Sequence, residues 1–124
     1  MKMRRALSAG SALMMAMALV GWTVFHLELT DSFPKADQVL TTSPGEMWLD
    51  FSVVPDLART SFSVRGPAGK VELGAIGVGD SPKTLRAKVT APLPDGEYTL
   101  SWVGAPIDDH TVRGRLSFTM AAGR

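Results

Sequence analysis

Hydrophobic and polar residues alternate in short runs along most of the chain. In residues 45–53, GEMWLDFSV, the apolar side chains of Met47, Leu49, Phe51 and Val53 recur at every second position. Alternate residues of an extended strand point to opposite faces, so these four side chains fall on one face. The pattern predicts a β-strand with one face against a hydrophobic core.

The same two-residue period returns in several further segments. It is found in residues 26–32, 59–70, 83–89, 96–103 and 112–120. The apolar positions that it assigns to a core are Phe62, Val64, Leu85, Ala87, Val89, Tyr98, Leu100, Trp102, Val112, Leu116 and Phe118. No helical period follows residue 25. About seven short strands separated by turn residues are typical of an all-β sandwich.

The first 25 residues have a different pattern. Lys2, Arg4 and Arg5 precede residues 6–25, which carry no charge. A basic start followed by an apolar run is typical of a signal peptide and predicts export. About 20 apolar residues can also span a bilayer, so an uncleaved membrane anchor is the alternative.

The cleavage position decides which residue starts the mature chain. Small residues at positions −1 and −3 favour cleavage after Ala18, because Ala16 is also small, and the mature chain would then begin at Leu19. Cleavage directly before His26 would place the large Phe25 at −1, which is a poor match.

Charge and composition exclude several function classes. The whole chain has 13 basic and 12 acidic residues, and residues 26–124 keep ten basic and twelve acidic ones, a net charge of −2. A nucleic-acid-binding protein needs a basic face, so this class is not expected. The chain has no cysteine, which excludes disulfides and thiolate metal sites. We find no glycine-rich phosphate loop or nucleophilic triad, and we do not expect an enzyme.

Scarce ligand-type side chains come just before the last predicted strand. Asp108, Asp109 and His110 precede Val112, and His26 is the only other histidine. Aspartates before a strand often make turn hydrogen bonds, so a purely structural role is one interpretation. If the segment is extended, Asp108 and His110 point to the same face and could contact one metal ion.

Two stretches resemble the CopC copper-resistance domain family. They are APLPDGEYTLSW, residues 91–102, and DDHTVRGRLSF, residues 108–118. The matching positions are Pro92, Leu93, Gly96, Tyr98, Leu100, Trp102, Asp108, His110, Gly114 and Phe118. HLELTDSFPKAD and MWLDFSV resemble the first half of the same domain. The resemblance implies an immunoglobulin-like Greek-key β-sandwich over residues 26–121, located in the periplasm.

The resemblance also implies a metal site and partners. In the family, the leading histidine and an Asp-x-His pair bind Cu(II), which nominates His26, Asp108 and His110 as ligands of one ion. Imidazole nitrogen and carboxylate oxygen are ligands that Cu(II) prefers. The implied partners are the copper ion and an inner-membrane copper transporter of the CopD type, and we expect a monomer.

Three departures from the family keep a second hypothesis open. Val53 stands where the family has a glutamate near the copper site. The α-amine of His26 is available as a ligand only if cleavage falls before it. Five of the seven methionines lie in the leader, so a methionine-rich Cu(I) site is not expected. We predict a periplasmic copper-binding protein; the alternative is a degenerate CopC-like interaction module without tight metal binding, tethered by an uncleaved leader.

Overall fold

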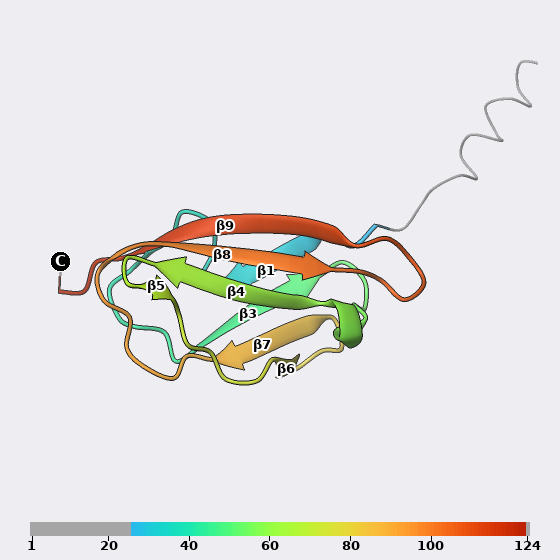
Figure 1. Cartoon of the computed structure of the whole chain (residues 1–124), viewed down its shortest axis with the longest axis horizontal. Helices are drawn as coiled ribbons and strands as arrows, with labels where there is room; N and C mark the ends of the chain where they lie inside the picture. The colour runs from blue at the N-terminus through green and yellow to red at the C-terminus, as the bar shows by residue number, and fades with distance from the viewer. Residues whose placement is uncertain (1–25, 124) are drawn as a thin grey trace, which may run out of the picture.

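The alternating segments form two β-sheets that pack face to face in a computed structural model, which describes residues 26–123 (Figure 1). The predicted leader, residues 1–25, lies outside the described residues. One sheet has the order β1 (Leu29–Phe33), β3 (Glu46–Phe51), β7 (Thr84–Lys88) and β6 (Gly77–Val78). The other has the order β2 (Val39–Leu40), β9 (Val112–Met120), β8 (Gly96–Gly104), β4 (Ser61–Gly66) and β5 (Gly69–Lys70). A 3₁₀ turn, η1 (Leu57–Arg59), precedes β4.

The chain crosses between the sheets early. β1 lies in the first sheet, β2 joins the second sheet, and β3 returns to the first. β2 pairs in parallel with β9, whereas every other neighbouring pair among the described strands is antiparallel. These crossovers confirm the predicted immunoglobulin-like Greek-key sandwich.

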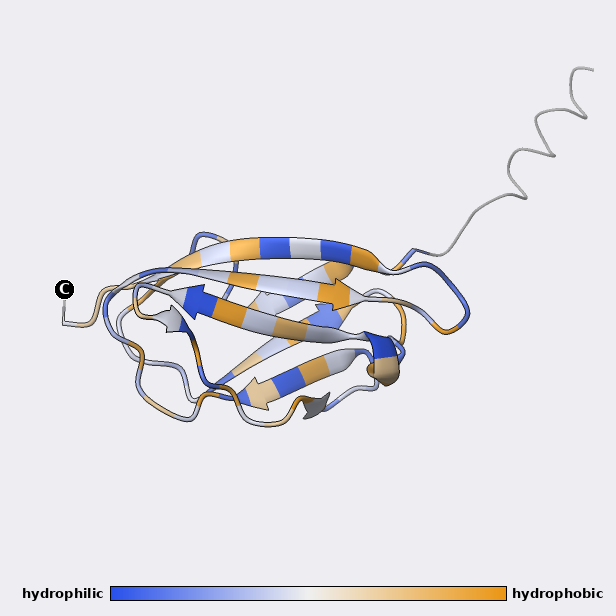
Figure 2. Ribbon diagram, in the orientation of Figure 1, coloured by the Kyte–Doolittle hydropathy of each residue, from blue (hydrophilic) through white to orange (hydrophobic). Residues whose placement is uncertain are grey.

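The core lies between the sheets and uses the predicted alternate positions. Figure 2 shows hydrophobic and hydrophilic residues following one another along the strands. Fully or nearly fully buried side chains from both sheets are Met47, Leu49, Phe51, Phe62, Val64, Leu85, Ala87, Tyr98, Leu100, Leu116, Phe118 and Met120. Val53, Val89, Trp102 and Val112 are partly buried and pack against them. The predicted core is therefore confirmed, and burial of this apolar surface provides the main driving force for folding.

Two aromatic pairs stabilise the core. The rings of Tyr98 and Phe118 stack with centroids 5.2 Å apart, and they are cross-strand partners in β8 and β9. Phe51 of the first sheet meets Trp102 of the second edge to face, at 5.3 Å. The Tyr98 hydroxyl donates a hydrogen bond to the carbonyl of Pro94 at 2.5 Å. A tyrosine bonded to backbone a few residues upstream is a recurrent stabilising feature of such sandwiches.

The two ends of the described chain lie at opposite ends of the sandwich. The first residues lie beside the loop between β8 and β9, whereas residues 121–123 lie at the far end (Figure 1). The β8–β9 loop and the start of the domain therefore form one end of the molecule, and the candidate site lies there.

Within residues 26–123, the structure has no helix of the length and hydrophobicity that a bilayer crossing requires.

Candidate metal site

Leu27 anchors the start of the domain beside the β8–β9 loop. Its side chain is only 3% exposed. It packs over Gly104, the last residue of β8, where an added Cβ would lie 2.8 Å from Leu27 Cδ2. The absence of a side chain at Gly104 thus lets Leu27 approach the backbone closely. His26, which precedes Leu27, is exposed at this end of the sandwich.

Ser52 provides the second attachment of this segment. Its hydroxyl donates to the carbonyl of His26 at 3.0 Å and accepts from the N–H of Glu28 at 3.0 Å. Its own N–H donates to the carbonyl of Glu28 at 2.8 Å. Because Ser52 directly follows β3, these bonds fix the backbone of residues 26–28 to the first sheet.

The loop carrying the Asp-x-His pair is a turn, not an extended strand. Asp108 has a φ of 63°, in the left-handed region, and β9 begins only at Val112. The expectation that Asp108 and His110 share one face of an extended segment is therefore wrong. Aspartate tolerates the left-handed conformation better than most residues, which suits it to this position. The side chains of Asp108 and His110 are both exposed.

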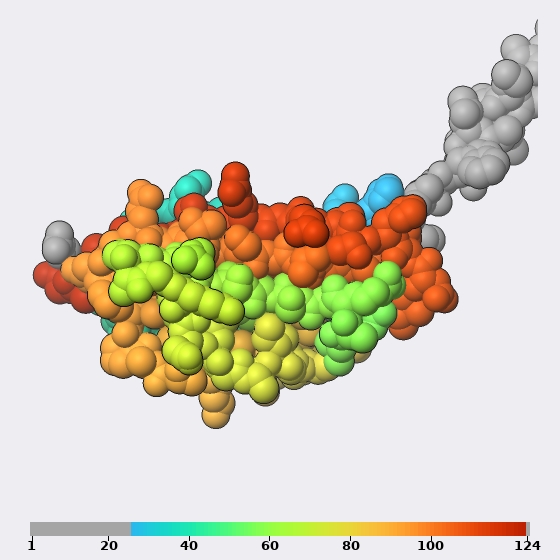
Figure 3. Space-filling model, in the orientation of Figure 1, coloured from blue at the N-terminus to red at the C-terminus, as the bar shows by residue number. Residues whose placement is uncertain are grey.

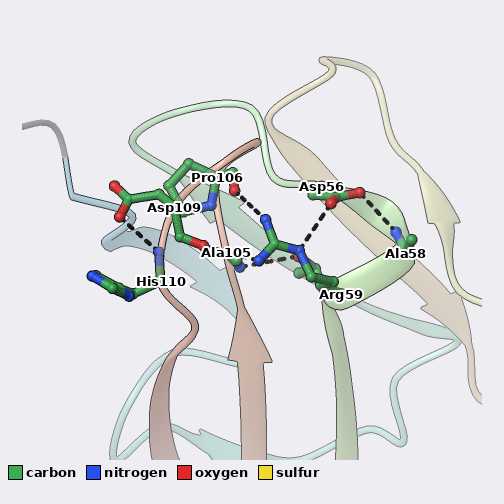
Figure 4. A network of polar contacts seen from close by, with 8 residues as sticks. Asp56, Ala58, Arg59, Ala105, Pro106, Asp109 and His110 are labelled. Atoms are coloured by element: carbon green, nitrogen blue, oxygen red, sulfur yellow. Dashed lines mark hydrogen bonds and ion pairs between the residues drawn. The ribbon is translucent and has the colours of Figure 1, made fainter.

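The peptide group between Asp109 and His110 is held on both sides (Figure 4). The His110 N–H donates to Oδ1 of Asp109 at 2.6 Å. Nη1 of Arg59 donates to the carbonyl of Asp109 at 2.9 Å, and Nη2 donates to the carbonyl of Pro106 at 2.7 Å. We call Arg59 with its partners Asp56, Pro106 and Asp109 the Arg59 bridge.

Asp56 completes the Arg59 bridge from the side of η1. Its Oδ2 lies 3.0 Å from Nε of Arg59, and its Oδ1 accepts from the N–H of Ala58 at 3.1 Å. The hydrogen bond from Arg59, followed by that from Ala58, lowers the pKa of Asp56 below its usual value. Asp56 therefore remains a carboxylate, able to orient Arg59, at neutral pH.

The three predicted ligands occupy one end of the molecule but do not form a ready cluster. No three His, Cys, Asp or Glu side chains within residues 26–123 lie close enough together to hold a metal ion. The structure brings the backbone segments of His26 and His110 to the same end, while all three predicted ligand side chains are exposed. Two imidazoles and a carboxylate are a donor set that suits Cu(II).

Other possible ligand positions are occupied by core side chains. Val53, at the position of the family glutamate, packs against the hydrophobic core. Met47 and Met120, the two methionines in the described part of the chain, are buried. They therefore do not present thioethers to a Cu(I) ion at the surface.

Sequence reasoning missed Ser52, Asp56 and Arg59. Ser52 directly follows Phe51 at the end of a predicted strand, where a hydroxyl often bonds nearby backbone. Asp56, with Arg59 three residues later, has the pattern of a capped helical turn. These local signals were present, but the partners are distant. Those of Arg59 in the β8–β9 loop lie 47 and 50 residues away along the chain, and His26, a partner of Ser52, lies 26 residues away.

Comparison with known proteins gives consistent matches. The CopC domain family matches residues 29–121. Copper resistance protein C of Escherichia coli is 27% identical over 103 residues, which cover 77% of this chain and 81% of that protein.

Two solved structures share the fold. PcoC, a methionine-rich copper resistance protein from Escherichia coli, has a TM-score of 0.71 at 26% identity, over 78% of this chain and 100% of that chain. CopC from Methylosinus trichosporium OB3b has a TM-score of 0.70 at 29% identity, over 80% and 97% of the two chains. The chain described here belongs to the CopC domain family.

Proposed function

We propose that this protein is exported to the periplasm and binds one Cu(II) ion through His26, Asp108 and His110. It serves copper resistance or homeostasis by holding the ion or delivering it to an inner-membrane copper transporter of the CopD type. The family membership and the copper-resistance relatives support this function. A binding role rather than catalysis is in keeping with this family and with the copper-resistance relative.

One observation carries the proposal. The packing of Leu27 on Gly104 and the hydrogen bonds of Ser52 hold His26 at the end of the sandwich where His110 stands. These are the only two histidines in the chain, and they come from segments more than 80 residues apart. The side chains of His26, Asp108 and His110 are exposed and lie outside the buried core, so an ion can bind them without disturbing the core.

Cu(II) suits this arrangement for chemical reasons. It prefers tetragonal sites of nitrogen and oxygen donors, and it binds a given set of such donors more tightly than the other divalent first-row metals. Cu(I) prefers thiolate and thioether ligands, but the chain has no cysteine, and Met47 and Met120 are buried, so the exposed imidazole and carboxylate donors favour Cu(II). If cleavage falls before His26, its α-amine adds a further nitrogen donor.

A Cu(II) titration of the exported protein, followed by EPR, tests the proposal. The intact mass of the same sample identifies the first residue of the mature chain. We expect one equivalent of Cu(II) with a tetragonal, nitrogen-containing spectrum, and we expect His110→Ala to lose this spectrum while keeping its circular dichroism. Unchanged copper binding by His110→Ala would place the site elsewhere.

A second candidate function is favoured by the position of Val53. Its side chain is partly buried and packs against the hydrophobic core. The described residues contain no preformed cluster of three metal ligands. Both features fit a CopC-like interaction module that has lost tight metal binding. Only weak copper uptake, without a defined spectrum, would support this candidate.

A further inference from the structure

Arg59 uses its whole guanidinium group to connect two parts of the molecule. Nε faces Asp56 Oδ2 at 3.0 Å, while Nη1 and Nη2 donate to the carbonyls of Asp109 and Pro106 at 2.9 and 2.7 Å. Figure 3 shows the green segment that contains η1 against the orange-red β8–β9 region at one end of the molecule. The planar fork of arginine can make these three bonds at once, and the ammonium group of lysine cannot reproduce the geometry.

The η1 side of the Arg59 bridge is itself fixed. Asp56 caps η1 through the N–H of Ala58, and its own N–H donates to the carbonyl of Ala105 at 2.8 Å. The side chains of Arg59 and Asp56 are 39% and 30% exposed, so solvent screens their charges considerably. An ion pair of this kind contributes little net stability, and its main effect is on geometry.

The hydrogen bonds of the Arg59 bridge act on the peptide group that directly precedes the Cα atom of His110. The carbonyl of Asp109 and the N–H of His110 belong to one planar peptide group. Arg59 holds the carbonyl, and the Asp109 carboxylate holds the N–H. With both sides of the plane fixed, the direction of the N–Cα bond of His110 is set, and fewer torsions remain to be ordered before the imidazole can meet an ion.

We propose that Arg59 is a positioning residue that fixes the backbone from which the imidazole of His110 reaches a divalent cation. This proposal rests on the proposed function, because it concerns the same site. Fixing the peptide plane before the ion arrives reduces the ordering that binding must otherwise impose on an exposed loop. Groups that hydrogen-bond a metal ligand directly typically contribute about 10–100-fold to metal affinity, and because Arg59 acts through the peptide group before His110 we expect an effect at the lower end of that range.

Three variants and one control test the positioning role. Arg59→Ala removes the Arg59 bridge. Arg59→Lys keeps the charge but not the fork, and Asp56→Asn keeps Arg59 but weakens its orientation. Arg113→Ala is the matched control, because Arg113 is an exposed arginine near the same end, at the second residue of β9. It removes one positive charge without touching the contacts of the Arg59 bridge.

The first measurement is the Cu(II) affinity of each variant by competition with a chelator of known affinity, in about 0.1 M salt, where charges beyond about 10 Å are screened. We expect Arg59→Ala to bind about 10-fold more weakly. Arg59→Lys and Asp56→Asn should fall between Arg59→Ala and the wild type. Arg113→Ala should match the wild type. The EPR spectrum of Arg59→Ala should broaden, because His110 then samples several orientations.

The second measurement is amide hydrogen exchange in the copper-free protein, which tests the Arg59 bridge independently of metal. We expect faster exchange at His110 in Arg59→Ala and an unchanged rate in Arg113→Ala. Equal copper affinity and equal spectra in wild type and Arg59→Ala would overturn the positioning role alone. A wild-type protein without specific Cu(II) binding would instead overturn the proposed function on which it rests.

Discussion

Tyr98 shows how one residue combines packing with a polar contact. Its ring is only 2% exposed and stacks on Phe118, and its hydroxyl donates to the carbonyl of Pro94. Burial, and then the negative charge of Asp95, raise the pKa of Tyr98 above its usual value of 10.0. The folded protein therefore holds this proton more tightly than the unfolded chain does.

The titration of Tyr98 can be followed without interference, because it is the only tyrosine in the chain. We expect tyrosinate absorbance to appear with a midpoint above pH 10 in the native protein and to return to about 10 in denaturant. A group whose pKa is raised by folding stabilises the fold below its unfolded pKa, and this stabilisation is lost as the pH rises through the folded pKa. Stability should thus fall above about pH 10, and less steeply in Tyr98→Phe. A native midpoint at or below 10 would contradict this prediction.

At the scale of elements, the β8–β9 hairpin depends on a glycine opposite a tryptophan. Trp102 and Gly114 are cross-strand partners. A Cβ added at Gly114 would lie 2.6 Å from Cε2 and Cζ2 of the indole. The bare glycine therefore gives Trp102 the space in which it packs against Phe51 across the sandwich.

Gly114→Ala should destabilise the fold by about 1–3 kcal/mol, because the indole or the strand must shift to admit the new methyl group. Urea unfolding followed by circular dichroism measures this change. Gly45→Ala is the matched control, since an added Cβ at Gly45 meets nothing within 4 Å. The packing explanation fails if both variants show the same stability.

The junction between the first segment and β3 gives a second prediction at this scale. Ser52→Ala removes the hydroxyl that bridges His26 and Glu28. A single hydrogen bond contributes about 1 kcal/mol, so the whole fold should remain stable while residues 26–28 loosen. Faster amide exchange at Glu28, together with weaker Cu(II) binding, is the expected result. If the amide of Glu28 exchanges as slowly in Ser52→Ala as in the wild type, the packing of Leu27 alone is enough to hold residues 26–28 in place.

The long elements were predictable from the sequence, because strands β3, β4, β7, β8 and β9 alternate clearly between buried and exposed positions. β2 and β6, each two residues long, were not predicted, since two residues cannot display a period. The conformation of the loop before β9 could not be predicted from its local sequence either. Asp108 adopts a turn in a loop that Arg59 holds through contacts 50 residues distant in the sequence.

At the scale of the whole molecule, the sandwich is complete without a metal ion. Its fifteen-residue buried cluster draws on both sheets. Every buried side-chain nitrogen or oxygen in residues 26–123 has a hydrogen-bond partner. The candidate ligands lie outside this cluster, on exposed positions. The fold therefore does not need an ion to close its core.

Chelator treatment should accordingly leave the protein folded, with near-UV circular dichroism and cooperative thermal unfolding intact. Adding Cu(II) should raise Tm, because a ligand that binds only the native state stabilises it, by about 2.7 kcal/mol at 100 times Kd. Scanning calorimetry with and without chelator measures both effects. Loss of cooperative unfolding after chelation would show that the metal is structural.

The opposite placement of the two chain ends has a practical consequence. Residues 121–123 lie across the sandwich from the β8–β9 loop (Figure 1). A resin, an electrode or a fluorophore attached through the carboxyl end would leave His26 and His110 facing the solution. For a protein with the proposed copper site, a carboxyl-terminal attachment is therefore the choice for an immobilised copper sensor, whereas a fusion at the amino end would lie beside the proposed ligands.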